Sequence, residues 1–207
     1  MIVQRPTPRR RLAGVVAAAL LTVGLLVGCG AADDASPTTG GAQSSLPAPV
    51  SAESSEPSTP IRVIVDGAEA VVDSVATDAA GVLLPPQDVG RLGWWVDSSL
   101  PGSGAGTIVV TGHVDDVDQG SGFAARFTPL TVGSIVEVAT ADGTAHRYRV
   151  TSSALTDKQR TGDGGLPTAE LNRTDGPETL ALVTCGGPFV GPPLGYRDNV
   201  VVFAVPA

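Results

Sequence analysis

Short runs of apolar, largely β-branched residues dominate the chain from residue 61 onward, with glycine, proline and aspartate between them. Runs of this length, bounded by turn-forming residues, predict β-strands. The predicted strands span residues 61–65, 107–111, 134–138, 146–151, 179–184 and 199–205. No stretch after residue 60 keeps a helical period for long, and only 122–130 and 166–171 have room for one or two turns of helix. The pattern predicts a mostly β fold of about eight strands, a closed or nearly closed β-barrel with short helices in its connections.

The first 28 residues have the pattern of an export signal. An uncharged stretch rich in alanine, leucine and valine, residues 12–27, follows a basic segment that contains Arg5, Arg9, Arg10 and Arg11. The segment Leu26-Val27-Gly28-Cys29 resembles a bacterial lipobox, in which the cysteine is lipidated and the signal is removed before it. We expect residues 1–28 to be a signal peptide and Cys29 to carry lipid. A retained signal anchor, a twin-arginine signal and a chance cysteine are the alternatives.

Residues 29–60 consist almost wholly of alanine, serine, threonine, proline, glycine and acidic residues. Such a composition cannot bury a core, so it predicts a disordered tether of about 30 Å that holds the following domain off a membrane. The expected organisation is a signal peptide, a tether over 29–60 and a folded catalytic domain over 61–207. The expected location is the extracytoplasmic face of the cell membrane.

The charge of the chain argues against one class of partner. The sequence has 13 Lys+Arg against 21 Asp+Glu, a formal net charge of −8. Removal of the signal would leave 9 basic residues, and the net charge would become 9 − 21 = −12. A surface this acidic repels phosphate backbones, so nucleic acid is not an expected partner.

Cys29 and Cys185 are the two cysteines of the sequence. An exported chain would normally pair them, but lipidation of Cys29 removes it from that choice. Cys185 is then an unpaired thiol in an oxidising compartment, which favours a chemical role. A buried, inert cysteine is the alternative.

Reactive side chains stand at the ends of three predicted strands. His113 follows residues 107–111, and Cys185 follows residues 179–184. Arg197 opens the last strand 12 residues after Cys185 (197 − 185), so a hairpin would bring it back beside the thiol.

Each of these residue types also has an ordinary structural role. A lone histidine is usually a surface or core residue, and an arginine at a strand start usually lies at a solvated edge. His146 alternates with polar residues along a predicted strand and is expected to face solvent. Gly186 and Gly187 favour a reactive Cys185, because they would leave the thiol uncrowded and let a substrate backbone approach it.

The order of these residues resembles the sortase family. A Gly-His strand end precedes a Thr-Cys strand end by 72 residues (185 − 113), and an arginine opens the next strand. Thr-Cys-Gly-Gly followed by Tyr-Arg-Asp-Asn-Val-Val-Val resembles class F in particular. Segments that fit the same class in the same order are Gly93-Trp94-Trp95, Pro101-Gly102-Ser103 and residues 111–115 and 130–133. The resemblance covers residues 61–204, with Ala181 where the family has threonine.

This resemblance implies a cysteine transpeptidase with a sortase-like barrel that cleaves a Leu-Pro-x-Thr-Gly-like sorting signal. Cys185 would be the nucleophile, His113 the proton carrier and Arg197 the charge stabiliser. Thr184 would help to place the substrate or its oxyanion. The implied partners are surface proteins with a C-terminal sorting signal, an amine acceptor such as a peptidoglycan precursor, and the membrane through lipid on Cys29. No cofactor is implied.

No metal site is expected, because the two histidines lie in unrelated strands. An acidic loop contains Asp115, Asp116 and Asp118 and could attract a cation. It lacks the glycine turn and the distal glutamate of an EF-hand, so we expect it to be solvated.

Two other functions compete with this interpretation. One is a non-catalytic lipoprotein whose barrel binds peptides or wall fragments, with Cys185 incidental. The other is an L,D-transpeptidase, but its expected His-Gly and Ser-x-Gly-Cys stretch is missing around Cys185.

Overall fold

The computed structural model describes residues 46–207, and the predicted signal peptide, Cys29 and the tether up to residue 45 lie outside the described residues. The strands are β1 Val50–Ser51, β2 Pro60–Val65, β3 Ala68–Ala76, β4 Leu92–Trp95, β5 Thr107–Thr111, β6 Asp115–Asp116, β7 Gly120–Ser121, β8 Ile135–Thr140, β9 Ala145–Asp157, β10 Thr179–Gly191 and β11 Gly195–Pro206. The helices are η1 Phe123–Phe127 and α1 Thr168–Leu171.

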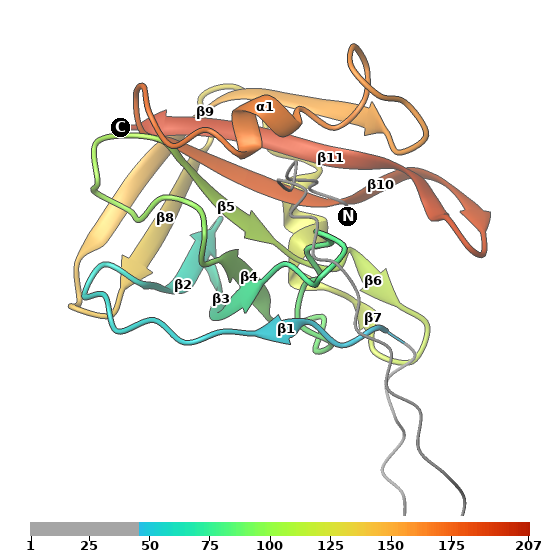
Figure 1. The fold of residues 1–207 in the computed structure, drawn as a ribbon, viewed down its shortest axis with the longest axis horizontal. Coiled ribbons are helices and arrows are strands. Elements are labelled where there is room, and N and C mark those ends of the chain that lie inside the picture. Colours follow the sequence, from blue (N-terminus) through green and yellow to red (C-terminus); the bar gives the residue numbers. More distant parts are fainter. Residues whose placement is uncertain (1–45) are drawn as a thin grey trace, which may run out of the picture. The chain divides into compact units, whose positions relative to one another are not determined.

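The main sheet closes into a barrel (Figure 1). Its strands pair in the order β3-β2-β8-β9-β11-β10-β5-β4, and β4 pairs back with β3. The predicted mostly β barrel with very little helix is therefore confirmed. Each of the six predicted strands overlaps an observed one, whereas the sequence pattern does not predict β3 and β4. The two helices fall inside the two segments that have room for a helical turn.

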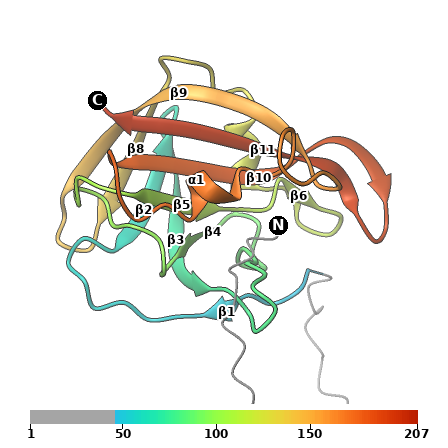
Figure 2. The same cartoon turned by 45° about the horizontal axis from the view of Figure 1, so that its top comes forward.

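Two apolar layers sandwich the wall formed by β10 and β11. Leu180 and Leu182 point into the barrel, where they belong to the larger buried cluster. Ala181 and Val183 point outward into a second cluster that includes Leu171 of α1. Figure 1 and Figure 2 show α1 beside β10 and β11, on the outside of the barrel. Strand β10 is therefore buried on both faces, which explains its almost continuous apolar sequence.

The folded part begins earlier than the predicted residue 61. Val50–Ser51 pairs with Val75 and Ala76 of β3, and Ala52 N donates a 3.0 Å hydrogen bond to Ser74 O. The segment before β2 is thus attached to the barrel by backbone pairing, which its composition does not reveal. Within residues 46–207, no helix is long and apolar enough to span a bilayer.

A buried carboxylate fixes the loop that follows Leu100. Glu178 accepts hydrogen bonds from the Tyr148 hydroxyl at 2.7 Å and from the backbone nitrogens of Gly102 and Gly104 at 3.1 and 2.6 Å. Glu178 is 6 % exposed and Tyr148 is fully buried. Burial, together with the Glu178 carboxylate, raises the pKa of Tyr148, so the phenol keeps the proton that it donates.

Glu178→Ala should lower the free energy of unfolding by about 3 kcal/mol, because it leaves a buried phenol and two backbone N–H groups without their acceptor. Urea denaturation measures the loss. Glu69→Ala, an exposed change on β3, is the matched control and should stay within about 0.5 kcal/mol of wild type. Equal losses in the two variants would show that the Glu178 hydrogen bonds contribute nothing.

Candidate active site

Cys185 and His113 are brought together by the parallel pairing of β5 with β10. The register runs from Thr107 opposite Thr179 to Thr111 opposite Val183. His113 and Cys185 each follow this last pair by two residues, so His113 lies just beyond the end of β5 and Cys185 lies within β10, and the register predicts that they are neighbours. Neighbouring strands lie about 4.8 Å apart, so the predicted nucleophile and proton carrier occupy adjacent positions at one end of the barrel.

Hydrogen bonds beyond the last ladder pair hold the two strands in this register. Gly112 N donates to Val183 O at 3.2 Å, and the Thr184 hydroxyl donates to Gly112 O at 2.8 Å. Thr184 is 2 % exposed, so its hydroxyl is used inside the protein. A Cβ on Gly112 would lie 2.5 Å from Leu92 Cδ2, so a glycine is needed for the strand to pass at this point.

His113 is half-buried, and its buried Nε2 atom finds no hydrogen-bond partner among the described residues. Burial lowers the pKa of His113, and the carboxylates of Asp116 and Asp115 oppose this shift only in part. A lowered pKa favours the neutral imidazole near pH 7, and a neutral imidazole is the form that can accept a thiol proton.

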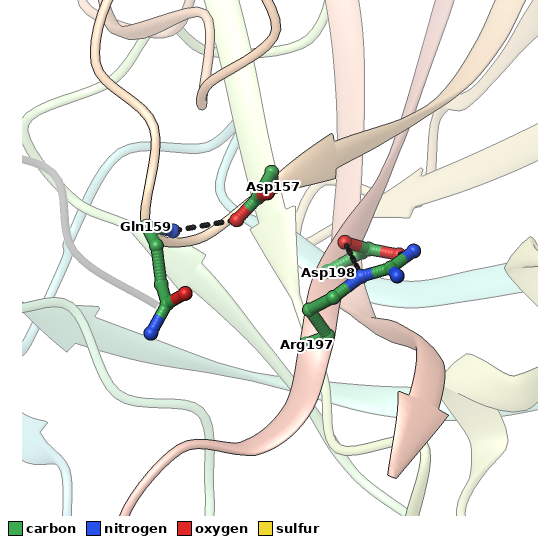
Figure 3. A network of polar contacts seen from close by, with 4 residues as sticks. All are labelled: Asp157, Gln159, Arg197 and Asp198. Carbon is green, nitrogen blue, oxygen red and sulfur yellow. Dashed lines mark hydrogen bonds and ion pairs between the residues drawn. The ribbon is translucent and has the colours of Figure 1, made fainter. Parts of the chain in front are cut away.

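Arg197 lies on β11, the other neighbour of the Cys185 strand, where Asn199 is the residue opposite Cys185. Figure 3 shows the Arg197 guanidinium against the carboxylate of Asp198. The Nε and Nη2 atoms of Arg197 donate to Asp198 at 2.9 and 2.8 Å. Asp198 is buried, and hydrogen bonds from Arg197 lower the pKa of this carboxyl. Among residues 46–207, the two N–H groups on Nη1 and the second N–H group on Nη2 have no hydrogen-bond partner and can face a substrate.

One basic residue at the site was missed by the sequence analysis. Lys158 follows the end of β9, and its ammonium donates to Cys185 Sγ at 3.3 Å. Its backbone N–H donates to Arg197 O at 3.2 Å, which ties this residue to β11. No motif in the sequence marks Lys158, because its position depends on how β9 pairs with β11.

The two glycines after Cys185 have a structural reason that differs from the expected one. A Cβ on Gly186 would lie 2.6 Å from Val200 Cγ2, and a Cβ on Gly187 would overlap Asp198 Oδ2. Gly187 also has a φ of +72°, which disfavours other residues. Both positions require glycine because side chains of β11, Val200 and Asp198, fill the space that a Cβ would occupy. Access to the thiol is therefore not the only reason for the two glycines.

The β10–β11 hairpin continues past the barrel beside the loop that follows His113. The Tyr196 hydroxyl donates to Asp115 Oδ2 at 2.5 Å, and its ring contacts Phe189 edge-on at 5.3 Å between centroids. Phe189 is 66 % exposed. The contact between Tyr196 and Asp115 thus joins the strand of Arg197 to the loop of His113, over an exposed apolar surface.

His146 lies apart from these residues. It pairs with Val138 near the start of β9, whereas Lys158 follows the far end of that strand. A strand of 13 residues spans on the order of 40 Å, so His146 is not placed to exchange a proton with Cys185.

The acidic loop uses its carboxylates within the protein. Asp116 Oδ1 accepts hydrogen bonds from the backbone nitrogens of Asp118 and Gln119 at 3.1 and 3.2 Å, and Asp115 accepts from Tyr196. Among residues 46–207 there is no group of three or more histidine, cysteine, aspartate or glutamate side chains that could hold a metal ion.

Comparison with known proteins defines the family. The sortase domain model matches residues 64–207, so the chain belongs to the sortase family, a family of transpeptidases. No curated protein matches the chain.

Solved sortases share the fold. The chain is 17% identical to sortase C-1 from Actinomyces oris, with a TM-score of 0.52 over 70% of each chain. Sortase A from Corynebacterium diphtheriae gives 17% identity and a TM-score of 0.52, over 72% of this chain and 60% of that chain. The pilus-related sortase C of Group B Streptococcus gives 16% identity and a TM-score of 0.52, over 75% of this chain and 69% of that chain. At these identities the likeness concerns the fold, and it confirms the predicted sortase-like barrel.

Gly187→Ala should destabilise the protein by about 1 kcal/mol more than Gly143→Ala, because both variants carry the strain of a positive φ but only the first displaces Asp198. Thermal and urea unfolding of the two variants measure the difference. A Cβ on Gly143 would have no other atom within 4 Å, which makes this position a control for strain alone. Identical losses would mean that Asp198 moves aside without cost.

Proposed function

We propose that the chain is a class F-type cysteine sortase that cleaves a Leu-Pro-x-Thr-Gly-like sorting signal and transfers the acyl group to a cell-wall or protein amine. The observation that carries the proposal is the parallel register of β5 with β10, whose last pair, Thr111 and Val183, lies two residues before His113 and Cys185. The family match supports transpeptidation in general. The choice of class, of signal and of amine rests on the sequence resemblance.

The first half of the reaction forms an acyl-enzyme. The Cys185 thiol gives its proton to the neutral His113 imidazole, and the sulfur attacks the carbonyl carbon of the scissile peptide bond. The resulting oxyanion collapses, the C–N bond breaks, and the imidazolium gives its proton to the leaving amine. The products are a thioester on Cys185 and a released C-terminal fragment.

The second half releases the acyl group. An incoming amine attacks the thioester carbonyl, His113 accepts a proton from it, and the C–S bond breaks. The thiolate then recovers the proton, and a new amide leaves the enzyme. Atoms and charges balance without a cofactor, because one amide bond is exchanged for another.

Arg197 is assigned the stabilisation of negative charge on the substrate carbonyl oxygen. Asp198 holds the guanidinium through Nε and Nη2, and this fixes its plane while the remaining N–H groups stay free. Thr184, whose hydroxyl is bonded to Gly112, is assigned to positioning the Cys185 strand for the substrate and its oxyanion.

Anchoring at the extracytoplasmic face of the membrane is part of the proposal. The lipobox-like segment before Cys29 supports removal of residues 1–28 and lipidation of that cysteine. The predicted mature chain begins at Cys29, with a diacylglyceryl mass, and leaves the membrane fraction when Cys29 is changed to Ser. An unprocessed N-terminal peptide in the membrane fraction would show a signal anchor instead.

Cys185→Ala should abolish both cleavage and transfer of a fluorogenic sorting peptide, because no other described side chain offers a thiol nucleophile. His113→Ala should lose nearly as much, since the proton then has no acceptor. His146→Ala is the matched control and should keep wild-type turnover. Turnover by Cys185→Ala would remove Cys185 from the mechanism. It would favour the alternative of a non-catalytic peptide-binding lipoprotein, with the turnover due to a contaminating enzyme.

Arg197→Lys should reduce kcat/KM by about 10²–10³, because an ammonium cannot reproduce the planar donors aimed at one oxygen. Arg147→Lys and Arg149→Lys, on the outside of β9, should stay near wild type. Circular dichroism melting separates lost chemistry from lost structure. Near-full activity of Arg197→Lys would reduce the site to Cys185 and His113.

A further inference from the structure

Lys158 is the sole lysine of the 207-residue sequence, and it contacts the sole cysteine of the described residues. The ammonium lies 3.3 Å from Cys185 Sγ, with the nitrogen as donor. Sulfur is a weak acceptor when it carries a proton and a much better one as a thiolate. The contact is therefore strongest in the form of Cys185 that attacks a carbonyl.

Backbone hydrogen bonds at Lys158 and at the preceding residue fix the position from which the Lys158 side chain extends. Its backbone N–H donates to Arg197 O at 3.2 Å, and Asp157 N donates to Gly164 O at 2.9 Å. The Asp157 carboxylate accepts the Gln159 backbone N–H at 2.8 Å and closes the turn, as Figure 3 shows. Lys158 thus leaves β9 in a defined direction, toward the β10 residue two strands away.

The other charged groups near Cys185 Sγ have partners elsewhere, and the Lys158 ammonium is the one beside the sulfur. On β11, the Arg197 guanidinium is turned to Asp198, and the Tyr196 hydroxyl is bonded to Asp115. Asp198 is also attracted by Lys158, and its own two oxygens are already occupied by Arg197.

On the other side of β10, burial keeps His113 neutral. Asp157 directs its carboxylate to its own turn. Among the described residues, Lys158 is the one cation with a hydrogen bond to the thiol.

Building on the proposed function, we propose that Lys158 is a catalytic residue that stabilises the thiolate of Cys185 through its ammonium charge, alongside the proton transfer assigned to His113. A cation in contact with a thiol favours the ionised form and raises its reactivity near neutral pH. Arg197 is then reserved for the substrate oxyanion, so the two cations of the site serve the two negative charges of the reaction, one on sulfur and one on oxygen.

The test measures alkylation of Cys185 by iodoacetamide as a function of pH, in the full-length protein without substrate. The readout is the mass of the peptide between Arg173 and Arg197, which contains Cys185 and is the same in every variant. In Lys158→Gln the alkylation profile should move to higher pH by about one unit, so that the rate at neutral pH falls about tenfold while the rates converge in alkali. Lys158→Arg keeps a charge and should restore most of the wild-type profile.

Arg160→Gln is the matched control, because it removes a cation two residues from Lys158 that does not bond to the thiol. This variant should have the alkylation profile of the wild type. The difference in pH between the alkylation profiles of wild type and Lys158→Gln should become smaller in 1 M salt, because the Lys158–Cys185 pair is only partly buried and salt screens it. Superimposable profiles for wild type and Lys158→Gln would overturn the proposal. So would an acyl group recovered on the Lys158 nitrogen after incubation with a sorting peptide, because a lysine that captures the acyl group acts as a nucleophile.

Turnover of the same sorting peptide by the wild-type protein separates the two proposals. A shifted alkylation profile without turnover would leave the Lys158–Cys185 pair in place and remove the sorting activity. Turnover without a shift would keep the sorting activity and remove Lys158 from the site.

Discussion

The parallel pairing of β5 with β10 is the constraint on which the candidate site depends. Its last pair lies two residues before both His113 and Cys185, and the Thr184 hydroxyl extends the contact between the strands to Gly112. A slip of one residue would turn every β10 side chain to the opposite face, so that Cys185 would exchange places with Thr184. The apolar layers on both faces of β10 resist such a slip, because it would move Leu182 out of the barrel interior and Val183 into it. The same packing that stabilises the barrel therefore aligns the reactive groups.

Charge at the site is arranged in separate pairs. Arg197 is held by buried Asp198, and Lys158 contacts Cys185. His113 has a lowered pKa because burial disfavours its charged form. A neutral base, a cation beside the sulfur and a fixed guanidinium suit a reaction in which negative charge appears first on sulfur and then on a carbonyl oxygen. The overall acidity of the chain does not reveal this local arrangement.

Local sequence was enough to predict the barrel, most of its strands and both helical turns, because short β-branched apolar runs and the turn residues between them depend on a few neighbouring positions. Strand β4 is only four residues long and contains Gly93, and β3 mixes polar and apolar residues, so neither produces a clear run. The order of motifs predicts His113 and Cys185 as candidate catalytic residues. The sequence did not predict Lys158 at the site, because its position depends on the register of β9 against β11, and the spacing of residues along the chain does not reveal that register.

The residue that carries the acyl group can be identified from the mass of the covalent intermediate. The protein is incubated with a Leu-Pro-x-Thr-Gly peptide, quenched in acid and digested, and the acylated residue is located by mass spectrometry. One acyl group is expected on Cys185 as a thioester, lost on addition of hydroxylamine and absent in His113→Ala. Peptide cleavage with unmodified Cys185, or an acyl group on any other residue, would contradict it.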